Sequence, residues 1–216
     1  MAARFLDDAA RAAFQEAIEA IERTSSAEIV VAVRRQSSGH LLANVQLGVA
    51  GAFLALAYML YSAHSFSLLS ILVDPFVLGV GLGGLAELVP PVKRLLILAR
   101  HRRLAVERSA KAAFFDRGVA NTRGRTGVLI YLSWLEERAA VLADSGVPES
   151  FRGAGCKALE EKLTAAMSAG GAAVARVLRE VAGELAACLP RREDDLNELP
   201  DAVDAQLARR SGGGAR

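Results

Sequence analysis

The stretch GVAGAFLALAYMLYS, Gly48–Ser62, decides how the rest of the chain can fold. It lies in a window from Gln36 up to Asp74 that contains no Asp, Glu, Lys or Arg, and a second apolar run covers residues 68–88. A helix needs roughly 20 apolar residues to cross the hydrocarbon layer of a membrane. A helix in a soluble core is rarely apolar on every face for that long. The sequence therefore predicts a two-helix transmembrane hairpin over residues 41–90, with a soluble core as the alternative.

The charges on either side of the hairpin predict its orientation. Arg34 and Arg35 precede the first span, the loop around His64 has no Lys or Arg, and a basic block begins at Lys93. Positive residues stay on the cytoplasmic side of membrane proteins. The N-terminal residues MAARFLDDAARAAF lack the layout of a signal peptide. We therefore expect a protein integral to the cytoplasmic membrane, with two spans and both termini cytoplasmic.

Glycines in the second run imitate a nucleotide-binding motif. Gly79, Gly81 and Gly84 spell G-x-G-x-x-G, but that motif requires a preceding strand and a helix start. Inside a membrane-length apolar run, the better interpretation is that Gly79 and Gly83 let two helices approach closely. The sequence predicts no nucleotide cofactor, and the formal net charge of +2 gives no reason to expect a nucleic-acid partner.

Outside the spans, the chain is predicted to form one α/β domain from residues 1–35 and 93–190. Helices are expected at residues 6–23 and 93–116 and in two segments after Pro148, centred on residues 156–167 and 174–185. Strands are expected at residues 28–34, 127–133 and 138–144. The polar tail, residues 191–216, is expected to be mostly disordered.

The order of these segments predicts a small mixed sheet. The first two strands are joined by a long crossover, which favours parallel pairing. The second and third strands form a hairpin and are therefore antiparallel. The predicted fold is α/β, with helices on the faces of the sheet and the membrane hairpin inserted after the first strand.

Several segments of the chain resemble one family. They are SAEIVVAV (26–33), AAFF (112–115), TRGRTGVLIY (122–131), Glu137-Arg138, DSGV (144–147) and LNELPD (196–201). Together and in this order, they resemble the TPM domain of bacterial membrane-associated proteins and of a thylakoid lumen protein, in its membrane-hairpin branch. The resemblance implies an α/β/α sandwich and, in some members, an acid phosphatase activity with bound calcium.

Candidate metal ligands are sparse in this sequence. Asp116 and Asp144 are the pair that could meet at the sheet edge and hold calcium or magnesium, ions that need several converging oxygens. Glu136 and Glu137 are interpreted as solvated carboxylates of a turn. The two cysteines, Cys156 and Cys188, lack the spacing of a zinc site or redox pair and are expected to be packed thiols.

The loop before the second strand is the best candidate for ligand binding. Thr122, Arg123, Arg125 and Thr126 supply two hydroxyls and two guanidiniums, groups that bind phosphate or carboxylate. Contact with anionic lipid and an ordinary solvated turn are the alternatives.

These observations lead to two function hypotheses. The first is a membrane-anchored, non-catalytic interaction or binding module on the cytoplasmic face, whose partners are the lipid bilayer and a membrane or cytoplasmic protein. The second is a metal-dependent acid phosphatase built on Asp116, Asp144 and the arginine loop. The absence of a suitable acid/base histidine in the sequence favours the first.

Overall fold

The computed structural model describes residues 5–37, 41–88, 99–191, 199 and 203–206. The chain divides into two compact units. We call residues 1–37 together with 102–216 the α/β unit, and residues 38–101 the helical unit.

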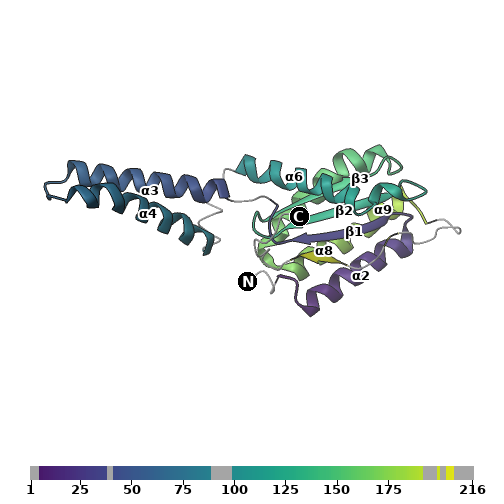
Figure 1. Ribbon diagram of the computed structural model, residues 1–216. Coiled ribbons are helices and arrows are strands. Elements are labelled where there is room, and N and C mark those ends of the chain that lie inside the picture. Colours follow the sequence, from purple (N-terminus) through teal and green to yellow (C-terminus); the bar gives the residue numbers. More distant parts are fainter. Residues whose placement is uncertain (1–4, 38–40, 89–98, 192–198, 200–202, 207–216) are drawn as a thin grey trace. The chain divides into compact units, whose positions relative to one another are not determined.

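The α/β unit is built on a four-stranded mixed sheet with the order β3-β2-β1-β4 (Figure 1). Its strands are β1 (Glu28–Arg34), β2 (Gly127–Ser133), β3 (Arg138–Ala143) and β4 (Asp204–Gln206). β1 is parallel to β2 and to β4, whereas β2 and β3 are antiparallel. The parallel pairing of the first two strands and the following hairpin confirm the sequence predictions.

Each face of the sheet packs against helices. Alternate residues of a strand point to opposite faces, and Ile29, Val31 and Val33 of β1 join one hydrophobic cluster while Val30 and Ala32 join another. The first cluster includes residues of α2 (Asp8–Thr24), α7 (Cys156–Ala166), α8 (Gly171–Glu180) and α9 (Ala182–Cys188). The second includes residues of α6 (Ala99–Asp116). The β-branched run of β1 is buried on both sides, as its composition indicates.

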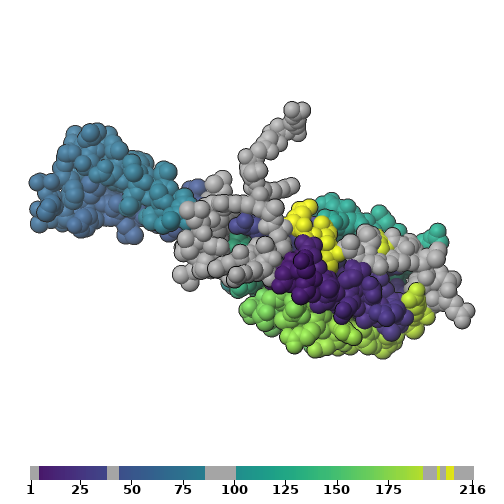
Figure 2. Space-filling model, turned by 90° about the horizontal axis from the view of Figure 1, so that it is seen from below, coloured from purple at the N-terminus to yellow at the C-terminus, as the bar shows by residue number. Residues whose placement is uncertain are grey.

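Helix ends follow local chemistry. Asp7 caps α2, where its carboxylate accepts the backbone N–H of Ala10 at 2.8 Å. Three short helical segments lie between the longer elements in chain order, at Val119–Asn121, Phe151–Gly155 and Met167–Ala169. Figure 2 shows α2, in purple, lying along the green surface of the C-terminal helices.

Two features of the C-terminal region differ from the sequence predictions. The last predicted helix is divided at Val181 into α8 and α9. The tail, expected to be mostly disordered, contributes β4, which pairs with residues 32–34 of β1. The first residues of the predicted 93–116 helix, 93–98, lie outside the described residues.

The helical unit consists of α3 (Leu41–Tyr61) and α4 (Leu68–Leu88), which pack through glycines. A Cβ added at Gly48 would lie 2.6 Å from the carbonyl oxygen of Gly79, and one added at Gly83 would lie 3.0 Å from that of Asn44. The backbones therefore approach too closely for larger residues. Gly79 and Gly83 have the packing role that the sequence predicted.

The outer surfaces of α3 and α4 are strongly apolar. Both helices are long and apolar enough to cross a membrane, and only 6% of the Asn44–Tyr61 window and 11% of the Leu68–Leu85 window are buried. Phe53 is 73% exposed and Leu68 is 85% exposed. A core helix of a soluble protein would bury such side chains.

Candidate functional site

We call residues 122–126, which immediately precede β2, the arginine loop. A hydrogen bond from Thr126 to Thr122 closes this loop. Thr122 is buried, and its hydroxyl oxygen accepts the backbone N–H of Thr126 at 3.1 Å. The backbone N–H of Arg125 donates to the carbonyl of Thr122 at 3.0 Å. Arg125 has φ 52°, in the left-handed region that is uncommon for a residue with a side chain. Thr122 is thus a structural member of the loop, while Arg123 and Arg125 are exposed at its tip.

Asp144 reaches the same loop from the end of β3. Its backbone N–H donates to the carbonyl of Gly127 at 2.9 Å, which extends the β2–β3 pairing by one residue. Its carboxylate accepts the Ser145 N–H at 2.6 Å and contacts Nη2 of Arg125 at 3.2 Å. The structure therefore brings together one predicted metal ligand and one predicted anion-binding residue.

The environment of Asp144 keeps it ionised. Burial by itself would raise the pKa of its carboxyl, but the Ser145 N–H and the Arg125 guanidinium outweigh burial and lower the pKa. The Arg125 side chain is 59% exposed and that of Asp144 only 7%, so solvent weakens the attraction between the arginine and the buried carboxylate. Both charged groups are already partly neutralised by one another.

Asp116 lies at the end of α6, exposed to solvent. It interacts electrostatically with Arg117, whose pKa is lowered by burial and by Arg34 and is raised in part by Asp116. Among the described residues there is no group of three or more His, Cys, Asp or Glu side chains that could hold a metal ion.

A second polar cluster lies at the opposite end of the parallel strands. We call Ser37, Ser109, Tyr131, Ser133 and Glu136 the Glu136 cluster. The Glu136 carboxylate accepts the Ser133 hydroxyl and the backbone N–H of Ser37, the latter at 3.1 Å. The Ser37 hydroxyl lies 2.7 Å from that of Ser133, and its carbonyl accepts the Ser109 hydroxyl at 2.8 Å. The cluster joins the end of β1, the end of β2 and α6.

The expectation that Glu136 is a solvated turn carboxylate is wrong. Glu136 is 1% exposed, because the chain after β2 stays beside the chain after β1: the N–H groups of Trp134 and Leu135 donate to the carbonyls of Arg34 and Arg35. No local sequence pattern marks this burial, because one donor to the Glu136 carboxylate is the N–H of Ser37, which lies 99 residues away in the chain. Glu137, the next residue, is half-buried and has φ 48°.

The Glu136 cluster is organised to hold structure together. Ser133 is fully buried, so its hydroxyl cannot meet a substrate without rearrangement. A buried carboxylate is stable only when its oxygens are hydrogen-bonded, and Ser37 and Ser133 provide those bonds. Ligands of parallel sheets bind at the carboxyl ends of the strands, and here the Glu136 cluster fills that position between β1 and β2.

β4 is fixed by charges that the sequence analysis did not anticipate. The carboxylate of Asp204 forms ion pairs with Arg34 of β1 and with Arg117, which follows α6. The Arg34 guanidinium also donates to the Asp204 carbonyl at 2.9 Å. Arg34 was predicted only as a topology signal, and its partner lies 170 residues away in the chain. No local pattern marks such a pair.

The cysteines are free thiols. Cys156 is buried in the cluster beneath the sheet, where burial raises its pKa to about 11. It therefore stays protonated and unreactive at neutral pH. Cys188 is half-buried against the same cluster.

Comparisons with known proteins support the fold. No protein family matches the sequence, and no curated protein does. The structure is similar to the NMR structure of the BA42 protein from the psychrophilic bacterium Bizionia argentinensis, with a TM-score of 0.54 and 15% sequence identity. The similarity covers 93% of this chain and 94% of the BA42 chain. At this level of identity, the likeness concerns the arrangement of the backbone alone.

Proposed function

We propose that this chain is an integral membrane protein whose α/β unit acts as a non-catalytic interaction or binding module at the cytoplasmic face of the membrane. One observation carries the proposal. The chain leaves β1 into two helices of membrane length, of whose apolar windows only 6% and 11% are buried. Exposed apolar surface of this extent needs an apolar environment, and a bilayer provides one for both helices.

Aromatic residues support a membrane position for the helical unit. Tyr58, Tyr61 and Phe66 lie close to the turn between α3 and α4, and Tyr61 is 91% exposed. The rings of Tyr58 and Phe66 meet edge to face with centroids 6.2 Å apart. Tyr residues concentrate at membrane–water interfaces. This end of the hairpin is thus suited to the outer interface.

The basic residues that follow the spans support cytoplasmic termini, by the same rule that the sequence analysis applied. The two hydrophobic clusters, one on each face of the sheet, support an α/β/α sandwich interrupted after β1 by the hairpin. We further propose that the α/β unit belongs with TPM-like domains, on the strength of the sequence segments given above.

The binding surface that we propose is the arginine loop. β4 covers residues 32–34 of β1, and Thr164 of α7 accepts a hydrogen bond from the outer edge of β3. The recognition element in this proposal is the exposed tip of the loop, Arg123 and Arg125. Guanidiniums bind carboxylate and phosphate groups, and the loop suits an acidic segment of a membrane or cytoplasmic protein.

The phosphatase alternative requires Asp144 to act as a metal ligand, together with Asp116. The ion pair with Arg125 and the bond from Ser145 oppose this role, because they already engage the carboxylate. We expect no divalent-ion-dependent hydrolysis of an aryl phosphate above background. Hydrolysis that needs calcium or magnesium and falls at least about a hundredfold in Asp144→Asn would favour the enzyme instead.

Topology reporters test the membrane proposal directly. A reporter that fluoresces only in the cytoplasm should be active when fused after Arg216, and one that is active only outside should work when inserted at His64. Both should remain with the membrane after alkaline carbonate extraction. The reverse reporter pattern would contradict the orientation, and release of the protein by carbonate would contradict membrane insertion.

A further inference from the structure

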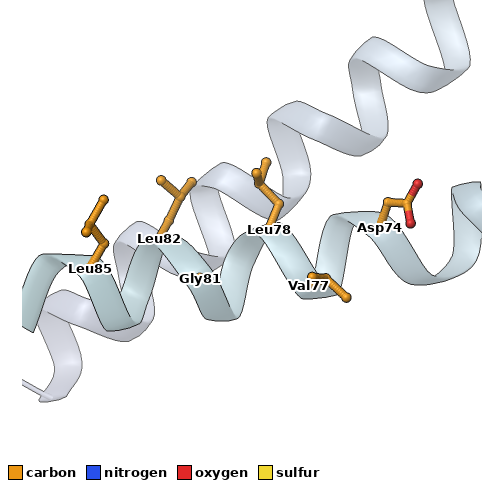
Figure 3. Close-up of a pocket in the computed structure, with 6 residues that line it drawn as sticks. All are labelled: Asp74, Val77, Leu78, Gly81, Leu82 and Leu85. Atoms are coloured by element: carbon orange, nitrogen blue, oxygen red, sulfur yellow. The ribbon is translucent and has the colours of Figure 1, made fainter.

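The exposed surfaces of α4 and α6 differ in their chemistry. Figure 3 shows a shallow groove along α4 whose lining is nonpolar except for Asp74. That surface suits the acyl chains of a bilayer, as proposed above. The outward face of α6 instead combines positive charges with apolar side chains. Such a combination suits the boundary between lipid headgroups and acyl chains.

The packing of α6 determines which of its residues face outward. Val106, Ala110 and Ala113 join the second hydrophobic cluster, so the opposite side of the helix faces away from the sheet. The outward residues follow one another at intervals of four, three and four positions. They are Leu104, Arg108, Lys111 and Phe115, which we call the α6 stripe. Leu104 is half-buried, and the other three are exposed.

The α6 stripe carries two cations and no carboxylate. Within the described part of the chain, neither Arg108 nor Lys111 forms an ion pair. The carboxylate of Glu107, which lies off the stripe, is already paired with Arg103 at 3.3 Å. Asp116 follows at the last position of the helix, beyond both cations. The stripe can therefore offer both positive charges to an external anion.

Phe115 adds an apolar side chain to these charges. It is 73% exposed, and every other large hydrophobic side chain that the described residues leave exposed belongs to α3 or α4. A single exposed hydrophobic residue is ordinary by itself. Here it continues a row of cations, and Phe is among the residues that enter the headgroup–acyl boundary at membrane surfaces.

The chain itself holds α6 near the start of α3. The Ser109 hydroxyl donates to the carbonyl of Ser37 at 2.8 Å, and α3 begins at Leu41. The chain between Ser37 and Leu41 can span at most about 14 Å. Because α3 enters the bilayer in the function proposed above, the middle of α6 then lies near the membrane surface. A bilayer is thus the anionic surface within reach of the stripe.

We propose that the α6 stripe binds the anionic headgroups of the bilayer that the hairpin spans. The Arg108 guanidinium and the Lys111 ammonium contact lipid phosphates, and Phe115 inserts beside them. Anionic lipids of the cytoplasmic leaflet attract basic segments that adjoin a membrane span. The proposal rests on the membrane insertion proposed above, and it adds a lipid-binding surface whose residues are distinct from the arginine loop.

Lysine acetylation in lipid nanodiscs tests this contact. The full chain is placed in nanodiscs of phosphatidylcholine alone or of phosphatidylcholine with phosphatidylglycerol, and mass spectrometry follows brief acetylation at each lysine. Acetylation of Lys111 should be at least about fivefold slower in the anionic nanodiscs, because headgroups cover its ammonium. Lys157, exposed on α7 against the other face of the sheet, is the internal control and should change little. In about 1 M sodium chloride, where the Debye length is about 3 Å, the difference should diminish.

Charge reversal at Arg108 tests the stripe itself. In anionic nanodiscs, Arg108→Glu should bring Lys111 acetylation to within about twofold of the rate that the same variant shows in phosphatidylcholine. Arg176→Glu is the matched control, since Arg176 is an exposed residue of α8, and it should retain the protection of Lys111. Phe115→Ser should weaken that protection. Circular dichroism checks that the variants, all at exposed positions, remain folded.

Three results would overturn the proposal. The first is equal acetylation of Lys111 in the two kinds of nanodisc, which would leave the stripe to an acidic protein. The second is an equal effect of anionic lipid on Lys111 and Lys157. The third is protection that persists in Arg108→Glu.

Carbonate extraction of vesicles of the same lipids separates this proposal from the one on which it rests. Protein that is released contradicts membrane insertion, and the tether that brings α6 to the bilayer fails with it. Protein that resists release but shows no lipid-dependent protection of Lys111 contradicts the α6 proposal alone.

Discussion

Two buried carboxylates of the α/β unit have different surroundings and different roles. Asp144 is held by a backbone N–H and an exposed arginine, whereas Glu136 is enclosed by backbone and hydroxyl donors. Asp144 thus connects the core to a surface loop, and Glu136 connects two strand ends within the core. Substitutions at the two positions should have correspondingly different consequences.

Asp144 should make stability depend on acid pH. Because its pKa is lowered in the folded state, its contribution is complete above the unfolded value of about 3.9 and is lost as pH falls through the folded pKa. Asp144→Asn should flatten this dependence and lower the free energy of unfolding at neutral pH by about 1–3 kcal/mol. Urea titrations at a series of pH values measure both effects.

Arg125→Ala is the companion variant at that site. Its side chain is largely exposed, and solvent screens such pairs, so we expect a loss of at most about 1 kcal/mol. A loss from Arg125→Ala as large as that from Asp144→Asn would contradict the view that the Ser145 bond and burial position the carboxylate.

Glu136 should be more sensitive to substitution. Glu136→Ala leaves the Ser37 N–H and the Ser133 hydroxyl without their acceptor in a buried site, and we expect a loss of about 3 kcal/mol or more. Glu136→Gln keeps one acceptor oxygen and should lose less. Denaturant unfolding measures both variants, with Glu137→Gln as the neighbouring control. Losses in Glu136→Ala no larger than in the control would contradict a structural role for the cluster.

At the scale of elements, α7 protects the outer edge of β3. The N–H of Ala139 donates to the Thr164 hydroxyl oxygen at 3.1 Å, and the N–H of Val141 donates to the Glu160 carboxylate. These two groups would otherwise be open to another strand. Exposed strand edges promote aggregation, so two α7 side chains replace the pairing of a fifth strand.

Removing the hydrogen bonds from β3 to Thr164 and Glu160 should lower the unfolding free energy and expose the edge of β3. Thr164→Val preserves the side-chain shape but removes the acceptor, and we expect a loss of about 1–2 kcal/mol in unfolding free energy. The double variant Thr164→Val, Glu160→Ala should also aggregate faster on mild heating, as followed by light scattering. Lys157→Ala, an exposed change on the same helix, is the control. An unchanged aggregation rate in the double variant would contradict the protective role.

The pH dependence of Glu160 has the opposite sign to that of Asp144. Burial raises its pKa, although the Val141 N–H acts against this rise. Protonation of Glu160 therefore contributes stability that is present below the unfolded pKa and is lost as pH rises through the folded pKa. Glu160→Gln should remove this contribution to the pH dependence of the unfolding free energy, as measured by urea titrations at a series of pH values.

At the scale of the whole molecule, the hairpin is an insertion that the α/β unit should not need. Both hydrophobic clusters of the sheet are formed by residues outside 38–101. Replacing residues 38–101 with a flexible linker should therefore give a soluble protein with cooperative unfolding, as seen by circular dichroism. Replacing residues 36–99 instead removes Ser37 from the Glu136 cluster and should lower stability further. Aggregation or non-cooperative unfolding of the first variant would contradict the division into units.

The sequence by itself determined the properties that depend on neighbouring residues. The apolar runs over residues 41–61 and 68–88 predicted two long apolar helices, and the β-branched run of β1 predicted a buried strand. Crossover length then predicted parallel pairing of β1 with β2. Composition and periodicity are sufficient here, because helix length, strand burial and hairpin formation are set within short segments.

Only the tertiary structure decided which distant residues meet. The Arg125–Asp144 pair joins positions 19 residues apart, and the Arg34–Asp204 pair joins positions 170 apart. β4 was missed because a three-residue strand in a polar tail has no periodic pattern of its own, and it pairs only where β1 offers its backbone. Glu136 was assigned to solvent because burial of a turn carboxylate depends on donors from another strand end. Such contacts arise when packing brings separate segments together, and local sequence patterns do not encode them.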